Sequence, residues 1–229
     1  MALSGLKTAG EFNVLTADLI LSTGETVGLK ASILGLTLFE SIDDICLTGS
    51  IIIQDSINLA SFGPLIGQEY LKLKIATPSL SGEDNIIDYT DNAFMITSLD
   101  ERTDIGNGTQ GSILTFVSRE FIVNQRSRIR RTLIGTYSDI VNQVLRKDLD
   151  SAKKFYIEPS VDSKKIISPN ITPFGAIGIS TKNAVSKKYN DATYTFFENT
   201  RGFNFKTLGN LYFKPPTMLY EYTIPGTRT

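Results

Sequence analysis

The stretch ILGLTLFESIDDICLTGSIIIQDSINLASFGPLIGQEYLKLKIA, residues 33–76, decides the fold of this 229-residue chain. Leu34, Leu36 and Leu38 alternate with other residue types, which is the two-residue period of a half-buried strand. Asp43 and Asp44 are typical of a turn, because short acidic side chains bond nearby backbone N–H groups. Dense β-branched residues then predict a second strand over 46–54, and alternating apolar and lysine residues predict a third over 70–77.

The flanking sequence extends this pattern into an antiparallel meander. Strand composition recurs in four further segments, at residues 12–21, 26–32, 86–100 and 112–118. The first two are separated by the turn sequence Ser-Thr-Gly-Glu, and the last two by a glycine-rich segment that we expect to form a flexible loop over 101–111. We therefore predict an antiparallel β-barrel or sandwich over residues 10–120.

The pattern changes after Arg119. Thr136 and Asp139 form a capping-box pattern ahead of apolar residues at helical spacing, which predicts a helix to about residue 149. Pro173 suits the first turn of a second helix. The predicted fold class is therefore α+β and mainly β. A smaller α/β domain with two helices follows at 121–192, and 193–229 form either the start of a second β domain or a C-terminal interface segment.

Composition argues against most catalytic and metal sites. The chain has no histidine, which removes the commonest metal ligand and general base, and its single cysteine, Cys46, cannot form an intramolecular disulfide or a cysteine cluster for zinc. The glycines at 106, 108 and 111 match a dinucleotide fingerprint as letters, but they lie between two predicted strands instead of opening a helix. We expect no catalytic residue, no cofactor and no metal.

The bulk properties indicate a soluble protein without a membrane segment. The net charge of −1 gives no general attraction to nucleic acid or to an anionic membrane. The first residues lack the apolar core of a signal peptide, and no apolar run approaches the ~20 residues that a spanning helix needs. We expect no membrane insertion.

One marked charge cluster consists of Arg126, Arg128, Arg130 and Arg131. Alternating arginines on an extended segment would point the same way and could grip phosphates. The alternative is a solvated strand edge, or an interface that forms salt bridges with a neighbouring subunit. We favour the alternative, because acidic and basic residues balance overall and no aromatic residues are interleaved.

Three segments, taken in order, resemble the baseplate hub proteins of contractile-tailed bacteriophages, which are related to the hub portion of type VI secretion spike proteins. The first, at 39–75, contains a Thr-Gly-Ser step before the isoleucine run and a Pro-x-x-Gly-x-Glu step before the next strand. The second, RRTLIGTYSDIVNQVLRKDL at 130–149, is similar to the helix that follows the first tube-like domain of such hubs. The third, at 173–208, is similar to a hub helix followed by an aromatic strand and Gly-Phe-x-Phe.

The resemblance implies a structural adaptor in the virion tail baseplate, assembled in the host cytoplasm. Hubs of this family form a homotrimeric ring of tube-like β-barrels that links the tail tube protein to the spike protein and contacts other baseplate proteins. Genome DNA passes through the lumen without specific binding. From this resemblance we expect the sequence to complete only the first of the family's two tube-like domains, as either a partial form of a longer hub or a shorter hub variant.

On this interpretation, the polar residues at the ends of the second strand are subunit contacts, not a chemical site. They are Thr48, Gly49, Ser50, Asp55 and Ser56. Two other functions stay open: a tail-associated peptidoglycan hydrolase that uses acidic residues, and a β-barrel module that binds nucleic acid through Arg126–Arg131.

Overall fold

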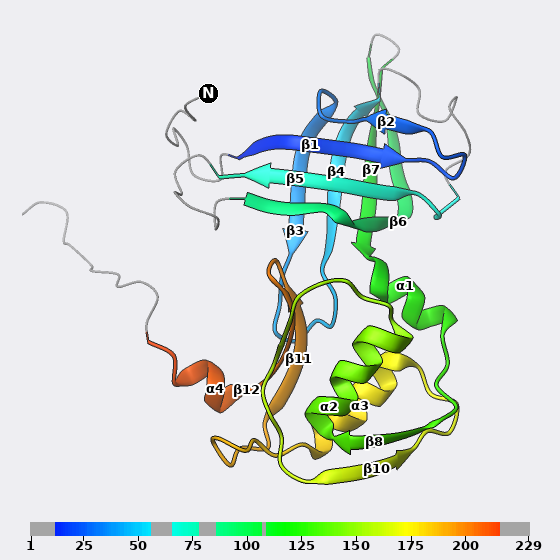
Figure 1. The fold of residues 1–229 in the computed structure, drawn as a ribbon. Helices are drawn as coiled ribbons and strands as arrows, with labels where there is room; N and C mark the ends of the chain where they lie inside the picture. The colour runs from blue at the N-terminus through cyan, green and yellow to red at the C-terminus, as the bar shows by residue number, and fades with distance from the viewer. Residues whose placement is uncertain (1–11, 56–65, 78–85, 107–108, 216–229) are drawn as a thin grey trace, which may run out of the picture.

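The computed structural model describes residues 12–55, 66–77, 86–106 and 109–215, and it confirms the mainly β, α+β class. Figure 1 shows a β unit above a smaller unit that contains most of the helices. The β unit is one seven-stranded sheet, in the order β2-β1-β5-β6-β7-β4-β3. Its strands are β1 (Asn13–Ile20), β2 (Thr26–Gly28), β3 (Ile33–Phe39), β4 (Thr48–Asp55), β5 (Tyr70–Ala76), β6 (Ile86–Gly106) and β7 (Thr109–Ser118).

The long strand β6 folds this sheet over on itself. Its first half pairs with β5, and from Phe94 onward it pairs with β7. In Figure 1 the strands β1, β2 and β5 therefore run across β3, β4 and β7. One apolar core lies between the two halves of the sheet, with residues such as Leu19, Leu71, Phe94 and Phe116 fully buried.

The sheet stays open at both ends. β2 and β3 are the two edge strands, and within the described ranges no ladder joins them. Of the two forms that the sequence predicted, barrel or sandwich, the described residues therefore form the sandwich. The predicted loop at 101–111 was wrong at both ends, because β6 continues to Gly106 and β7 begins at Thr109.

The turn of the first hairpin, at residues 22–25, is present as predicted. Gly24 has φ of 89°, a backbone conformation that L side chains rarely adopt, and its N–H donates to the carbonyl oxygen of Leu21 at 2.9 Å. The Leu21 N–H in turn donates to Glu25. This turn joins β1 to β2.

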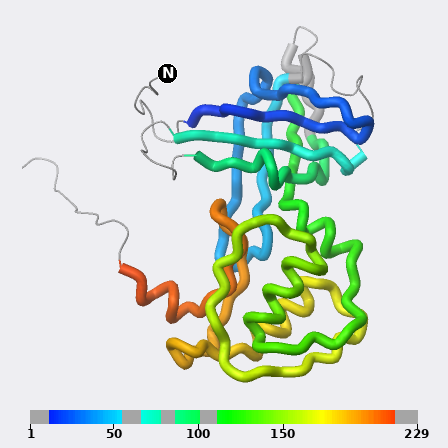
Figure 2. The backbone as a smooth tube through the Cα atoms, viewed as in Figure 1, coloured from blue at the N-terminus to red at the C-terminus, as the bar shows by residue number. Residues whose placement is uncertain are grey.

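The second unit packs helices against a small sheet. Its elements are α1 (Arg119–Arg126), β8 (Thr132–Thr136), α2 (Tyr137–Gln143), the π-helical turn η3 (Val144–Asp148), β9 (Phe155–Ile157), β10 (Ser163–Ile167), α3 (Pro173–Asn183), β11 (Tyr194–Asn199), β12 (Gly202–Thr207) and α4 (Leu208–Tyr212). Both predicted helices are present, the first as α2 with η3 and the second as α3. Figure 2 shows the backbone winding from α1 through α2 to α3 and back to the β11–β12 hairpin.

The β11–β12 hairpin shares its core with the helices. It forms a three-stranded sheet in the order β11-β12-β9, with β12 parallel to β9. Phe196, Phe203 and Phe205 from this sheet lie in one buried cluster with Ile140 of α2 and Ile177 of α3. The expected division at residues 120 and 192 stays a prediction, and residues 216–229 lie outside the described residues.

No helix within the described ranges has both the length and the apolar character that crossing a membrane requires.

Candidate functional site

The predicted subunit-contact residues of β4 lie inside the sheet. The backbone of β4 pairs with β3 on one side and with β7 on the other, so its own sheet already uses both edges. Thr48 is exposed on the outer face, Ser50 is partly buried and Gly49 is buried. Asp55 ends the strand, opposite Gln110 of β7, and Ser56 lies outside the described residues. Their role as subunit contacts stays a prediction.

Gly49 has a packing role that the sequence did not reveal. A Cβ atom at this position would overlap the ring of Phe116 and would lie 2.5 Å from the carbonyl oxygen of Thr37. The Phe116 ring therefore occupies the space that a side chain would need. The Thr-Gly-Ser step is a place where a core aromatic residue crosses a strand at close range.

The arginine cluster is not one phosphate-gripping row. Arg131 forms a two-pronged ion pair with Asp148 at 2.5 and 2.7 Å, and its hydrogen bonds to that carboxylate raise the pKa of Arg131. Arg130 donates to the Asn170 side chain at 2.8 Å. Arg128 donates to the backbone carbonyls of Gln125 and Ser127 at the end of α1, and Arg126 lies in the last turn of that helix.

The structure instead reveals a buried ion triad where the two units meet. The Nζ atom of Lys153 lies 2.7 Å from a carboxylate oxygen of Glu120 and 2.6 Å from one of Glu198. All three side chains are buried. Glu120 lies in the first turn of α1, which directly follows β7, and Glu198 lies on β11, so the triad joins segments that are far apart in the sequence.

Further hydrogen bonds tie this triad to both units. The Ser151 hydroxyl donates to Glu120 at 2.6 Å, and the Leu47 backbone N–H donates to Glu198 at 3.1 Å. Leu47 belongs to the core of the β unit, whereas Glu198 lies in the second unit. Charged groups that leave water need such partners, since an unpaired buried charge is strongly destabilising.

Burial and ion pairing shift the pKa values of Lys153 and Glu198 in opposite directions. Burial disfavours the charged form of Lys153, but Glu198 and Glu120 together outweigh it and raise the pKa of Lys153. Burial raises the pKa of Glu198, and the Lys153 ammonium opposes that rise. The ammonium is therefore firmly held in its charged form at neutral pH.

The triad is suited to structure more than to chemistry. The two carboxylates are close together, which could suggest an acid–base pair, but each is bonded to Lys153 and buried from solvent. A substrate would have to displace that ammonium to reach either one. Within the described ranges, no group of three Cys, Asp or Glu residues could hold a metal ion.

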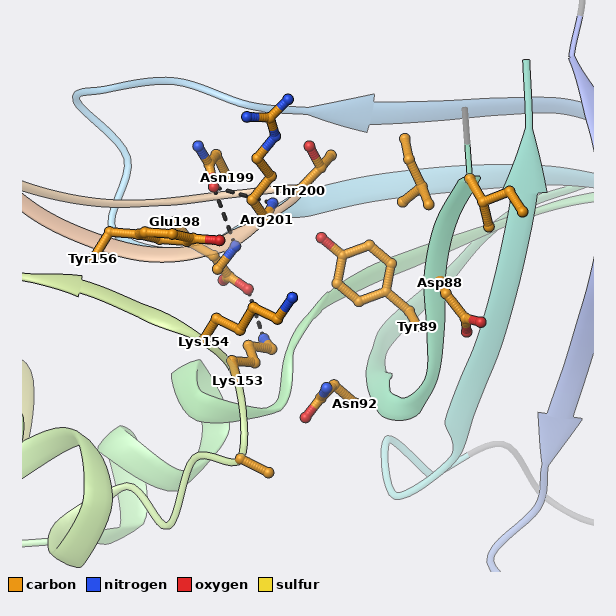
Figure 3. A pocket seen from close by; sticks show the side chains of 14 residues that line it. Asp88, Tyr89, Asn92, Lys153, Lys154, Tyr156, Glu198, Asn199, Thr200 and Arg201 are labelled. Atoms are coloured by element: carbon orange, nitrogen blue, oxygen red, sulfur yellow. Dashed lines mark hydrogen bonds and ion pairs between the residues drawn. The ribbon is translucent and has the colours of Figure 1, made fainter. Parts of the chain in front are cut away.

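A cleft of about 620 Å³ opens beside the triad, between the start of β6 and the β11–β12 turn. Figure 3 shows Tyr89 pointing into it from β6, with Lys154, Tyr156 and Arg201 on the opposite side. Burial raises the pKa of Tyr89 strongly. Its buried hydroxyl has no hydrogen-bond partner among the residues that the structure describes.

Sequence reasoning missed the triad, although one signal was available. Tyr194, Phe196 and Glu198 fall on one face of an alternating strand, and the two aromatic residues pack inward. A glutamate on an inward face needs a cation or several donors. The partner could not have been chosen from the sequence, because Lys153 and Lys154 are adjacent and only the first points inward.

Comparison with known proteins bears on the fold. No protein-family model matches the chain, and no curated protein matches it in sequence. Among solved structures, it is similar to the 43 kDa tail protein of prophage MuSo2 from Shewanella oneidensis, with a TM-score of 0.53 and 9% identity over 83% of this chain and 52% of the other. It is also similar to a tail protein from Neisseria meningitidis MC58, with a TM-score of 0.50 and 11% identity over 83% and 49%.

These likenesses cover most of this chain but only about half of each tail protein. Identities near one in ten residues establish shared architecture and not shared activity. The chain has the fold of one half of these phage tail proteins.

Proposed function

We propose that this chain is a structural baseplate hub of a phage tail or a related contractile injection machine. The observation that carries the proposal is the shared fold with two tail proteins over 83% of the chain. In this role the chain assembles with copies of itself, as a trimeric ring, and adapts the tail tube protein to the spike and to other baseplate proteins.

The open sheet of the β unit supports an assembly role. β3 is an edge strand, and on and beside it lie apolar side chains that are unusually exposed, with Leu34 at 61%, Phe39 at 58% and Ile52 at 42%. Phe39 and Ile52 lie on the outer face, opposite the core residues of β3 and β4. An edge strand with exposed apolar side chains is a site where another chain can add.

The test is the mass of the purified protein in solution, followed by electron microscopy of the particles. We expect trimers or rings at micromolar concentration, alone or with a tube or spike protein. The double variant Phe39→Glu/Ile52→Glu should lower the assembled fraction at least tenfold and keep the wild-type circular dichroism spectrum. Ile167→Glu, at an exposed position of β10, is the matched control and should assemble normally.

A protein that stays monomeric at all concentrations, and that binds neither tube nor spike proteins, contradicts the proposal. Equal loss of assembly in the Ile167→Glu control would show that the outer face of β3 and β4 has no special part in it.

A further inference from the structure

The face of the β11-β12-β9 sheet that points away from α2 and α3 carries the buried Asn204 and the partly exposed Lys206 and Tyr156. Phe203 and Phe205 of β12 face the helices, so Asn204 and Lys206 between and beyond them face the other way. Tyr156 of β9 lies opposite Asn204 in the parallel ladder. The Lys206 ammonium lies 5.0 Å from the centre of the Tyr156 ring and donates to Asn204 at 2.8 Å.

Lysines without carboxylate partners gather around this face. Within the part of the chain that the structure describes, none of them forms an ion pair, although the whole chain has a net charge of −1. Lys154 lies beside Tyr156 at the cleft, and the backbone of Lys187 bonds Pro159, just after β9. The set is Lys154, Lys187, Lys188, Lys206 and Lys214.

Aromatic rings lie between these lysines. Tyr189 and Phe213 stack in parallel with their centres 5.5 Å apart, and the Lys188 ammonium lies 4.8 Å from the Tyr189 ring. Tyr212 is 80% exposed and Phe213 is 75% exposed, although rings of this size are normally covered. We call this surface, formed by the five lysines with Tyr156, Tyr189, Tyr212 and Phe213, the basic aromatic face.

The Lys206 and Lys214 charges on this face repel one another. Burial and the neighbouring Lys214 charge lower the pKa of Lys206. A bound anion would relieve that repulsion, whereas a neutral partner would leave it in place. The geometry therefore favours a ligand with repeated negative charges and flat groups between them.

We propose that the basic aromatic face binds a single strand of nucleic acid. Proteins that hold single strands combine a positive surface along the phosphates with exposed rings on which successive bases stack. The Arg126–Arg131 cluster lacks this combination, because three of its guanidiniums are bonded locally. An acidic protein segment would use the lysines but would gain little from the exposed rings.

The experiment is fluorescence anisotropy of a labelled 20-nucleotide oligo-dT with the full chain. We expect binding that weakens steeply with salt. Lys187→Glu/Lys188→Glu should weaken binding at least tenfold. It should also reduce the slope of log K against log salt by about 1.4, because each phosphate contact on a single strand contributes ~0.7 to that slope. Lys164→Glu/Lys165→Glu is the matched control, since the same Ser-Lys-Lys sequence lies exposed on β10, and it should bind as the wild type does.

A second pair of variants separates stacking from charge. Tyr212→Ala/Phe213→Ala should weaken oligo-dT about tenfold at unchanged salt slope. Ile134→Ala, which removes an exposed apolar side chain elsewhere, should have no effect. Equal binding of polyglutamate, or of a duplex of the same length, would overturn the proposal, as would the absence of oligo-dT binding by the folded chain. None of these results depends on ring assembly.

Discussion

At Gly49, one missing side chain determines how closely two strands and an aromatic ring can approach. The Phe116 ring occupies the space beside the Gly49 Cα atom, and the Thr37 carbonyl closes the other side. We predict that Gly49→Ala lowers the free energy of unfolding by about 1–3 kcal/mol, because an added methyl group overpacks a dense core.

Chemical denaturation with urea measures this change. Gly178→Ala is the matched control, because nothing lies within 4 Å of an added Cβ there and the site is in helix α3. Alanine favours a helix over glycine by roughly 1 kcal/mol, so the control should gain stability. Equal effects of the two substitutions would contradict the packing role of Gly49.

Leu34 shows where period-two reasoning failed at the residue scale. The alternation of Leu34, Leu36 and Leu38 predicted one common face. In the structure an irregularity of register between Ile33 and Gly35 leaves Leu34 without a partner, and its side chain is exposed. A bulge inserts one residue into one strand, so the alternation shifts at that point. The spacing of the leucines does not indicate this irregularity of register.

The start of α2 shows where local sequence was sufficient. Thr136 accepts a hydrogen bond from the Asp139 N–H at 3.2 Å, and the Asp139 carboxylate accepts one from the Thr136 N–H at 3.1 Å. This confirms the predicted capping box. The capping box could be predicted because its hydrogen bonds join residues within one four-residue segment, so they do not depend on distant parts of the chain.

We predict that Thr136→Ala destabilises the protein by about 1 kcal/mol, because it removes the acceptor for the first-turn donor. The measurement is the midpoint of urea denaturation. Thr132→Ala, at the exposed beginning of the same strand β8, is the control and should change stability by less than half as much. A larger loss in the control would place the effect in the strand and not in the helix cap.

At the scale of the whole molecule, the Lys153 triad links the two units. Lys153→Met keeps an unbranched side chain of similar shape but leaves the Glu120 and Glu198 carboxylates buried without their cation. We predict a loss of about 3–5 kcal/mol in the free energy of unfolding. Limited proteolysis should also show faster cleavage between the units.

A triple variant tests whether the loss comes from charge. Adding Glu120→Gln and Glu198→Gln to Lys153→Met removes the uncompensated charges, so part of the stability should return. If the triple variant is less stable than Lys153→Met, the ammonium is not needed to neutralise these carboxylates.

The pH dependence follows from the raised pKa of Lys153. A group whose folded pKa lies above its unfolded value stabilises fully below the unfolded value, near 10.5, and less as pH rises through the folded value. We predict that the stability gap between the wild type and Lys153→Met narrows as pH rises above 10.5. Denaturation at a series of pH values measures it, and a gap that widens at high pH would contradict it.

By itself, the sequence determined the fold class, both main helices and the first hairpin turn, because these depend on contacts among residues a few positions apart. It also indicated a phage-tail architecture, through the order of three segments.

Only the tertiary structure decided which charged residues pair with one another. Asp148, 17 residues beyond Arg131, pairs with the Arg131 guanidinium, and Lys153 pairs with glutamates 33 and 45 positions away. Local patterns carry no information about which distant charges meet, since that depends on how β7, α1 and β11 are packed together. The three strands predicted within residues 33–76 are present as β3, β4 and β5. The Thr-Gly-Ser step also accommodates the Phe116 ring, a requirement that appears only when β7 lies beside β4.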